Sequence, residues 1–224
     1  MNGSAHVIPL FLHAPAIAFL AAALLAAGAA PAFAQPAAAG GEGGVEVRVD
    51  WPKFLARQDI VWTALPAQFD DGAFLGNGLM GATIYRDGPN RLRWEMGRAD
   101  VTEHRRDNAR LPIGGLVLTT VGTIQGGTLR LDLFNAEVRG EIRTDKGTVA
   151  FRSFIHTDEM AMLIDIATTG EENAAKFAWE ARPAVDPVNR YAPAEVNPAP
   201  HSTSSDGIAL CEQQRFAGGA FATA

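Results

Sequence analysis

Residues 74–85, FLGNGLMGATIY, contain the pattern that decides the fold of this chain. Glycine and asparagine tolerate positive φ angles, so Gly76-Asn77-Gly78 predicts a tight turn. The apolar segment that follows predicts a strand, and Gly81 within it indicates a bulge or a close backbone approach. The glycines have the spacing of a dinucleotide-binding G-x-G-x-x-G motif, but that motif requires a helix after it. The stretch therefore predicts a turn that enters a sheet.

Strand patterns continue along the chain at intervals of roughly ten residues. The expected strands cover residues 45–50, 79–86, 91–98, 111–121, 126–134, 138–143, 149–155, 160–167 and 176–181. No long stretch has the periodicity of an amphipathic helix. Short strands with regular turn signals predict an all-β fold, an antiparallel β-sandwich or barrel. Two sheets that each offer an apolar face can bury an adequate core at this length, and we expect the sandwich.

The first 34 residues have the composition of a secretory signal peptide. Residues 16–30 are apolar, and Ala32-Phe33-Ala34 forms an A-x-A cleavage pattern before Gln35. The run is short for a membrane span, which needs about 20 apolar residues. An uncleaved membrane anchor is the alternative, because no Lys or Arg precedes the run. We expect export to the periplasm or secretion, without stable membrane insertion after cleavage.

Composition excludes several classes of function. The net charge of −6 belongs wholly to the chain after residue 34, and this acidity argues against nucleic-acid binding. The sole cysteine, Cys211, cannot form an internal disulfide. An exported protein without disulfides is commoner in bacteria than among small extracellular eukaryotic domains. No Cys/His cluster has zinc spacing, and we expect neither a metal nor another cofactor.

The chain divides by composition into a leader, a linker and one main domain. We expect a signal peptide at 1–34, a flexible linker at 35–44, the β-sandwich at 45–182, a Pro-rich loop or linker at 183–207, and further sandwich strands at 208–224. A strand begins after Gly218-Gly219 and has no room to finish. The end is either a frayed tail or a truncation of a longer protein, and we expect a sandwich that is incomplete at its C-terminal end.

Three stretches carry a family likeness: residues 75–82 (LGNGLMGA), 92–100 (LRWEMGRAD) and 111–118 (LPIGGLVL). Their order and spacing resemble the N-terminal β-sandwich region of glycoside hydrolase family 95, the α-L-fucosidases and α-L-galactosidases, and its relatives. The first is similar to the family's GNG-x-x-GA phrase, and the third to its P-x-G-x-L-x-L strand. Residues 214–219 (QRFAGG) also resemble a late strand of such sandwiches.

The resemblance implies a supersandwich-like portion of an exported glycoside hydrolase that acts on terminal sugars such as α-L-fucose. In family 95 the catalytic groups lie in an (α/α)6 barrel after the sandwich, and this sequence contains no such barrel. No catalytic residue therefore carries over, and this chain alone is expected to be inactive, with carbohydrate bound through the missing domain. The alternative is a stand-alone, non-catalytic periplasmic sandwich that binds carbohydrate or is purely structural.

Four residues are candidate substrate contacts: Asn77, Asp100, His104 and Trp62. Asp100 and His104 lie in a loop where acidic residues alternate with arginines, and loops on a rigid sandwich commonly carry binding residues. That loop has three interpretations: a glycosidase carboxyl pair formed by Asp100 and Glu103, a salt-bridged connection, or the rim of a substrate pocket. Trp62 could stack on a sugar ring, whereas tryptophans of β-rich domains commonly fill the core.

Overall fold

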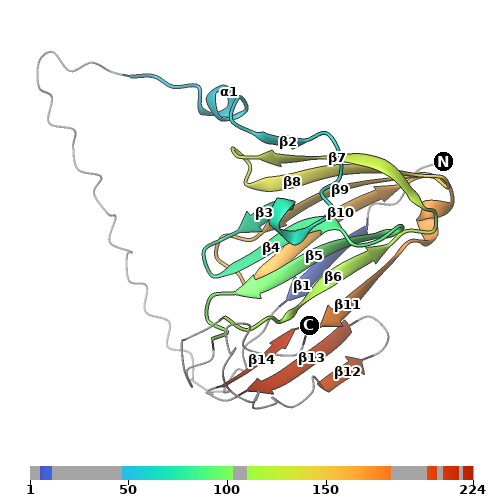
Figure 1. Ribbon diagram of the computed structural model, residues 1–224. Coiled ribbons are helices and arrows are strands. Elements are labelled where there is room, and N and C mark those ends of the chain that lie inside the picture. Colours follow the sequence, from blue (N-terminus) through green and yellow to red (C-terminus); the bar gives the residue numbers. More distant parts are fainter. Residues whose placement is uncertain are drawn as a thin grey trace, which may run out of the picture.

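The computed structural model describes residues 6–11, 47–102, 110–182, 201–205, 209–216 and 219–223 (Figure 1). Its strands form a six-stranded sheet of order β1-β10-β9-β8-β7-β2, a five-stranded sheet of order β11-β6-β5-β4-β3, and a three-stranded sheet of order β12-β13-β14. Every strand pair is antiparallel. The first two sheets pack face to face around the core, which confirms the predicted all-β antiparallel sandwich.

The elements have the following bounds. The six-stranded sheet contains β1 (His6–Phe11), β2 (Ile60–Trp62), β7 (Ile124–Asp132), β8 (Glu137–Thr144), β9 (Thr148–Ile155) and β10 (Ala161–Thr168). The five-stranded sheet contains β3 (Ala73–Gly76), β4 (Met80–Arg86), β5 (Arg91–Arg98), β6 (Gly114–Thr119) and β11 (Lys176–Ala181). The remaining elements are β12 (His201–Ser205), β13 (Ala209–Phe216), β14 (Gly219–Thr223), the helix α1 (Trp51–Leu55) and two 3-10 turns at Phe69–Asp71 and Gly170–Ala174.

The core lies between the two larger sheets because alternate side chains of each strand point inward. Trp94 of β5 is fully buried, and its ring meets the Phe151 ring of β9 edge to face, with centroids 5.2 Å apart. Its indole nitrogen donates a hydrogen bond of 3.2 Å to the Ser153 hydroxyl, also on β9. This one side chain therefore ties the sheets together by both packing and a hydrogen bond.

The predicted glycine turn is confirmed, and it joins β3 to β4. Gly78 has a φ angle of 94°, in the region that favours glycine. The Asn77 side-chain oxygen accepts hydrogen bonds from the backbone nitrogens of Leu79 (3.0 Å) and Met80 (2.8 Å). Gly81 continues the ladder in regular register, and a Cβ there would lie only 3.3 Å from a backbone oxygen of β3. Of the two interpretations of Gly81, the close backbone approach is the one observed.

The strand expected at residues 45–50 is wrong for its described part, because residues 47–50 form no strand and lead into α1. The Asp50 side chain accepts a hydrogen bond of 3.2 Å from the Lys53 nitrogen, which caps the helix. Pro52 stands in the first turn, where proline is tolerated. The alternating valines have no partner strand, so the helix favoured by the capping Asp50 and by Pro52 forms instead of a strand.

Other differences lie at the ends of the chain and in short strands. β12 lies within the stretch expected as a Pro-rich loop, and it pairs with β13; the rest of residues 183–207 is outside the described part. β2 and β3 are too short to show a period and were not expected. Of the predicted leader the structure describes only β1, an edge strand beside β10, so signal cleavage stays a prediction. β13 and β14 are strands, as expected for residues 208–224, but they pair with each other and with β12 in a separate three-stranded sheet.

Candidate functional site: a groove on the five-stranded sheet

The outer face of the five-stranded sheet carries a groove of about 770 Å³. A row of three glycines crosses its floor, because Gly81 of β4 pairs with Gly76 of β3 on one side and with Gly97 of β5 on the other. Without side chains, this row forms a hollow between bulkier rows of residues. A Cβ added at Gly97 would meet no heavy atom within 4 Å, so the groove is open above this strand.

One wall of the groove is apolar. Phe69, Phe74 and Leu79 line it, and each side chain is about half exposed to solvent. Phe74 comes from β3, Leu79 from the turn before β4, and Phe69 from the 3-10 turn, where its ring meets Tyr85 edge to face. Large apolar side chains gathered on a surface mark an interaction site more often than scattered ones do. This wall therefore suits contact with another apolar surface.

The cross-strand row that begins at Phe74 continues through Thr83 to a largely buried carboxylate. Glu95 of β5 is 12% exposed, and its Oε1 forms an ion pair with Arg182 Nε at 2.7 Å. Its Oε2 lies 3.5 Å from Arg93 Nη1, an ion-pair distance, but it is buried without a hydrogen-bond partner. This oxygen therefore has acceptor capacity that no described donor uses, and it is shielded from solvent. Glu95 is thus a candidate polar contact for a ligand that displaces the groups covering this oxygen.

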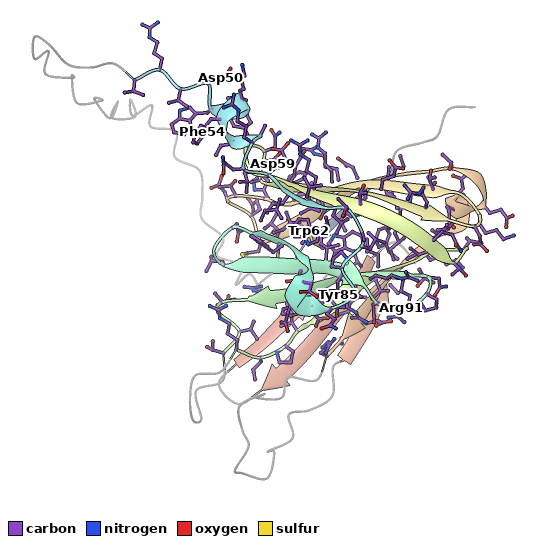
Figure 2. The ribbon with its side chains drawn as sticks, turned by 45° about the horizontal axis from the view of Figure 1, so that its top comes forward. Asp50, Phe54, Asp59, Trp62, Tyr85 and Arg91 are labelled. Atoms are coloured by element: carbon purple, nitrogen blue, oxygen red, sulfur yellow. The ribbon has the colours of Figure 1, made fainter. Side chains whose placement is uncertain are left out.

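Tyr85 adds a hydroxyl to the same wall (Figure 2). Burial raises the pKa of its phenol, and the nearby Glu95 carboxylate raises that pKa further. The hydroxyl therefore stays protonated at neutral pH and remains available as a hydrogen-bond donor. Tyr85 and Glu95 together offer one donor and one acceptor beside the apolar wall.

An ion-pair network lies next to Glu95 on the same outer face of the sheet. Arg93 is almost fully buried; its Nε donates to Asp87 at 2.8 Å, and its Nη2 donates to Glu180 of β11. Arg91 also donates to both Glu180 oxygens, at 2.7 and 2.8 Å. Burial alone would raise the pKa values of Asp87 and Glu180, but the arginine hydrogen bonds and charges outweigh it and lower both pKa values. The network joins β5 to β11, which are not neighbours in the sheet.

The structure gives Asn77 a structural task at the rim of the groove. Its side-chain oxygen closes the turn, and its Nδ2 donates a 2.9 Å hydrogen bond to the His156 backbone oxygen, which follows β9. The amide therefore connects the turn of one sheet to a loop of the other. A sugar contact by Asn77 would have to compete with these bonds.

Asp100 is salt-bridged, and Trp62 is a packing residue. The Asp100 carboxylate accepts hydrogen bonds from Arg98 at 2.9 and 2.6 Å, and these bonds lower its pKa against the opposing effect of burial. The ring of Trp62 packs against the core, and its nitrogen donates to the Asp71 oxygen at 2.9 Å. Figure 2 shows Trp62 between the two sheets. His104 and Glu103 lie outside the described residues.

The sequence reasoning missed Glu95, Tyr85 and Phe74. A signal for Glu95 was present, because β5 alternates strictly between core residues and the outward pair Arg93 and Glu95. A carboxylate on an otherwise apolar strand is a candidate once its face is known. Tyr85 and Phe74 had no such signal, because isolated aromatic residues in strands are ordinary.

The lining of the groove, as far as the structure describes it, holds one carboxylate. Glu95 is the only carboxylate among the described residues that line it, and glycosidases use two. In the part of the chain that the structure describes, no three His, Cys, Asp or Glu side chains are grouped to hold a metal ion. The described helices include none long and apolar enough to cross a membrane. No protein-family model matches this sequence, and no curated protein matches it.

Proposed function

We propose that this chain is the sandwich portion of an exported glycoside hydrolase that resembles family 95. The whole enzyme acts on terminal sugars such as α-L-fucose, with its catalytic (α/α)6 barrel outside these 224 residues. One observation carries the proposal: the three stretches similar to that family line a single groove. Residues 75–82, 95–99 and 111–112 contribute to its lining, from successive strands of one sheet and the segments beside them.

The chemistry of the groove supports a role beside a sugar pocket. Phe69 and Phe74 offer aromatic surface, which suits the apolar C–H face of a pyranose or the surface of a packed domain. Glu95 has an unbonded carboxylate oxygen that suits a sugar hydroxyl. The sandwich thus closes one side of the pocket, while the acid and base carboxyl groups come from the barrel.

The test uses an aryl α-L-fucoside with two polypeptides. One is this chain, and the other is the longer product encoded by continuing the gene past the codon for Ala224. We expect no turnover by the chain alone and clear turnover by the longer product. Phe74→Ala in the longer product should lower kcat/KM by about ten-fold through lost positioning. Turnover by this chain alone contradicts the proposal, as does a stop codon followed by unrelated sequence.

A stand-alone carbohydrate-binding sandwich is the second candidate. The half-exposed aromatic wall favours it, because this wall could serve a sugar without a second domain. This candidate predicts that the chain alone binds a methyl fucoside, measured by NMR titration, and that Glu95→Gln weakens this binding. The hydrolase proposal predicts that such binding is weak until the barrel is present.

A further inference from the structure

A second groove, of about 650 Å³, lies on the outer face of the six-stranded sheet and carries a row of arginines. Arg130 of β7 directly opposes Arg139 of β8, which in turn opposes Arg152 of β9. All three line the groove, and their side chains are about half exposed. We call these three residues the arginine row. It lies on the opposite side of the sandwich from the glycine-floored groove and is independent of the function proposed for that groove.

Like charges directly opposite each other on neighbouring strands destabilise a sheet. Here carboxylates beside the row hold it in place. Asp59, whose side chain is 3% exposed, accepts a hydrogen bond from Arg130 Nε at 2.7 Å. It directly precedes β2, the edge strand beside β7 (Figure 2). Glu137, at 0%, accepts from Arg139 Nε at 2.5 Å and from Arg152 Nε. Burying a carboxylate carries a desolvation cost, and both Asp59 and Glu137 are buried. The fold therefore gives up some stability at two carboxylates while it fixes three guanidinium groups at its surface.

The row beside the arginines contains two alanines and a glutamate. Ala150 of β9 pairs with Ala167 of β10 on one side and with Glu141 of β8 on the other, and all three line the groove. The two alanines leave a hollow along the arginine row. On the other side of the row, the Arg152 guanidinium lies 4.8 Å from the centre of the Phe154 ring, which restricts its orientation.

The guanidinium groups keep donors for a ligand. Each has five N–H donors in a planar fork, which suits bidentate binding of a carboxylate or sulfate. Asp59 contacts only Nε and Nη2 of Arg130, and Glu137 contacts only Nε and Nη2 of Arg139. Among the contacts of the described residues, the Nη1 groups of Arg130 and Arg139 remain for an external anion.

The length of the arginine row indicates the size of the anion. Neighbouring strands lie about 4.8 Å apart, so three arginines on adjacent strands extend over about 10 Å. A single small ion contacts one or two of them, whereas a polymer with regularly spaced charges contacts all three. The alanine hollow beside the row gives room for the uncharged rings of such a polymer.

We propose that this groove binds an anionic polysaccharide, whose carboxylate or sulfate groups meet Arg130, Arg139 and Arg152 while its sugar rings lie over Ala150 and Ala167. Two carboxylates that line the groove oppose this ligand: Glu141, in the same hollow, and Asp165, which continues the arginine row and is ion-paired with Arg152 at 3.4 Å. Neutralising Glu141 should therefore strengthen binding, and adding a negative charge on the alanine floor should weaken it. These two substitutions should change the affinity for the polyanion in opposite directions, and neither removes an ion pair of the arginine row.

The experiment measures binding of the 224-residue chain to polygalacturonate, dextran sulfate and neutral dextran by isothermal titration calorimetry, with inorganic sulfate as a small-ion control. We expect binding to at least one polyanion, weaker at high salt, and no binding to neutral dextran. The two polyanions distinguish carboxylate from sulfate recognition. Absence of polyanion binding overturns the proposal, and so does equal binding of neutral dextran or of inorganic sulfate alone.

Matched variants then locate the binding. Ala150→Glu should weaken binding about five-fold relative to Ala150→Gln, which adds the same bulk without charge, and Glu141→Gln should strengthen it about three-fold. Both positions are exposed, and neither contacts Asp59 or Glu137, so the fold should be retained; circular dichroism checks this. Equal affinities of Ala150→Glu and Ala150→Gln overturn the assignment to this groove. Glu141→Gln gives an independent answer if Ala150→Glu does not fold.

Discussion

The two outer faces of this sandwich each carry a groove, and the grooves are built on the same principle with different chemistry. In both, a row of small residues crosses neighbouring strands and leaves a hollow: Gly76, Gly81 and Gly97 on one sheet, Ala150 and Ala167 on the other. The wall of the first is apolar and aromatic, whereas that of the second is a row of arginines. The shape comes from the register, and the chemistry comes from the residues in the adjacent row.

A buried carboxylate lies at each groove, and its bonding differs. Both oxygens of Glu137 accept hydrogen bonds from arginines whose own side chains are about half exposed. Oε1 of Glu95 forms an ion pair with Arg182, whereas Oε2 is buried without a hydrogen-bond partner. Glu137 therefore stabilises the cations beside it, whereas Glu95 keeps an unused acceptor that is shielded from solvent. The acceptor capacity of Glu137 is used within the fold, and that of Glu95 is used only in part.

The largest expected effect comes from the core that both grooves share. Trp94→Ala removes a fully buried ring from between the sheets and should lower the free energy of unfolding by about 3–5 kcal/mol. Urea denaturation measures this loss. Because Trp94 joins β5 to β9, ligand binding at both grooves should weaken together. Trp94→Phe, which keeps most of the packing, is the control; loss of binding at only one groove would contradict a shared core.

The next prediction compares the loss of stability at Glu137 with that at Glu95. Glu137→Gln removes a charge that accepts from two arginines, so it should lower the free energy of unfolding by about 2 kcal/mol. Glu95→Gln should cost less, about 0.5–1 kcal/mol, because one oxygen has no hydrogen bond to lose. Paired denaturation curves of the two variants give the difference. Equal losses would show that Glu95 is as saturated as Glu137.

Much of the fold could be predicted from the sequence, because alternation reports which face of a strand is buried. β5 and β11 have the bounds that the pattern predicted, and the glycine turn lies at residues 76–78 as expected. The prediction failed at residues 47–50, where alternation had no partner strand and the cap by Asp50 decided the local structure. Local patterns do not say whether a strand finds a neighbour.

Neither groove could be predicted in the same way, because each depends on register between distant strands. Gly81 and Gly97 become neighbours only through the pairing of β4 with β5. Arg130 and Arg152 flank Arg139 only because three strands share one register. A shift of one residue would turn every side chain to the other face, so register decides the surface chemistry. No motif in the linear sequence contains this information.

A smaller effect on the free energy of unfolding should follow from pH, through the ion-pair network next to Glu95. The pKa values of Asp87 and Glu180 are lowered from 3.8 and 4.5 by Arg93 and Arg91, so their ionised forms stabilise the fold above those ordinary values. This stabilisation should be lost as the pH falls through the lowered pKa values, since the unfolded chain then binds more protons. The carboxylates are partly exposed, so each contributes about 1 kcal/mol or less.

The measurement is the melting temperature as a function of pH, for the wild type and for Arg93→Met. The variant removes the buried arginine, so its melting temperature should fall less steeply below pH 4.5. Other carboxylates with lowered pKa values, such as Asp100, contribute equally to both curves. Parallel curves would show that the network does not carry the pH dependence of folding.

The smallest effect on stability, with a clear effect on one groove, is expected from Gly97→Val. A Cβ at this position meets open space, φ is not in the left-handed region, and valine suits a strand, so the free energy of unfolding should change by no more than about 0.5 kcal/mol. The added side chain fills the glycine-floored hollow. It should lower fucoside binding or turnover by about ten-fold and leave polyanion binding at the arginine row unchanged.

Gly140→Val is the matched control for Gly97→Val, because it places the same side chain on a strand of the other sheet where there is no room. A Cβ at Gly140 would lie 2.2 Å from the Phe151 ring, so this variant should be destabilised by about 1–3 kcal/mol. Denaturation curves and two binding titrations separate a filled groove from a strained core. If Gly97→Val weakened both ligands equally, the two grooves would not be independent sites, and the contrast between the two faces would fail.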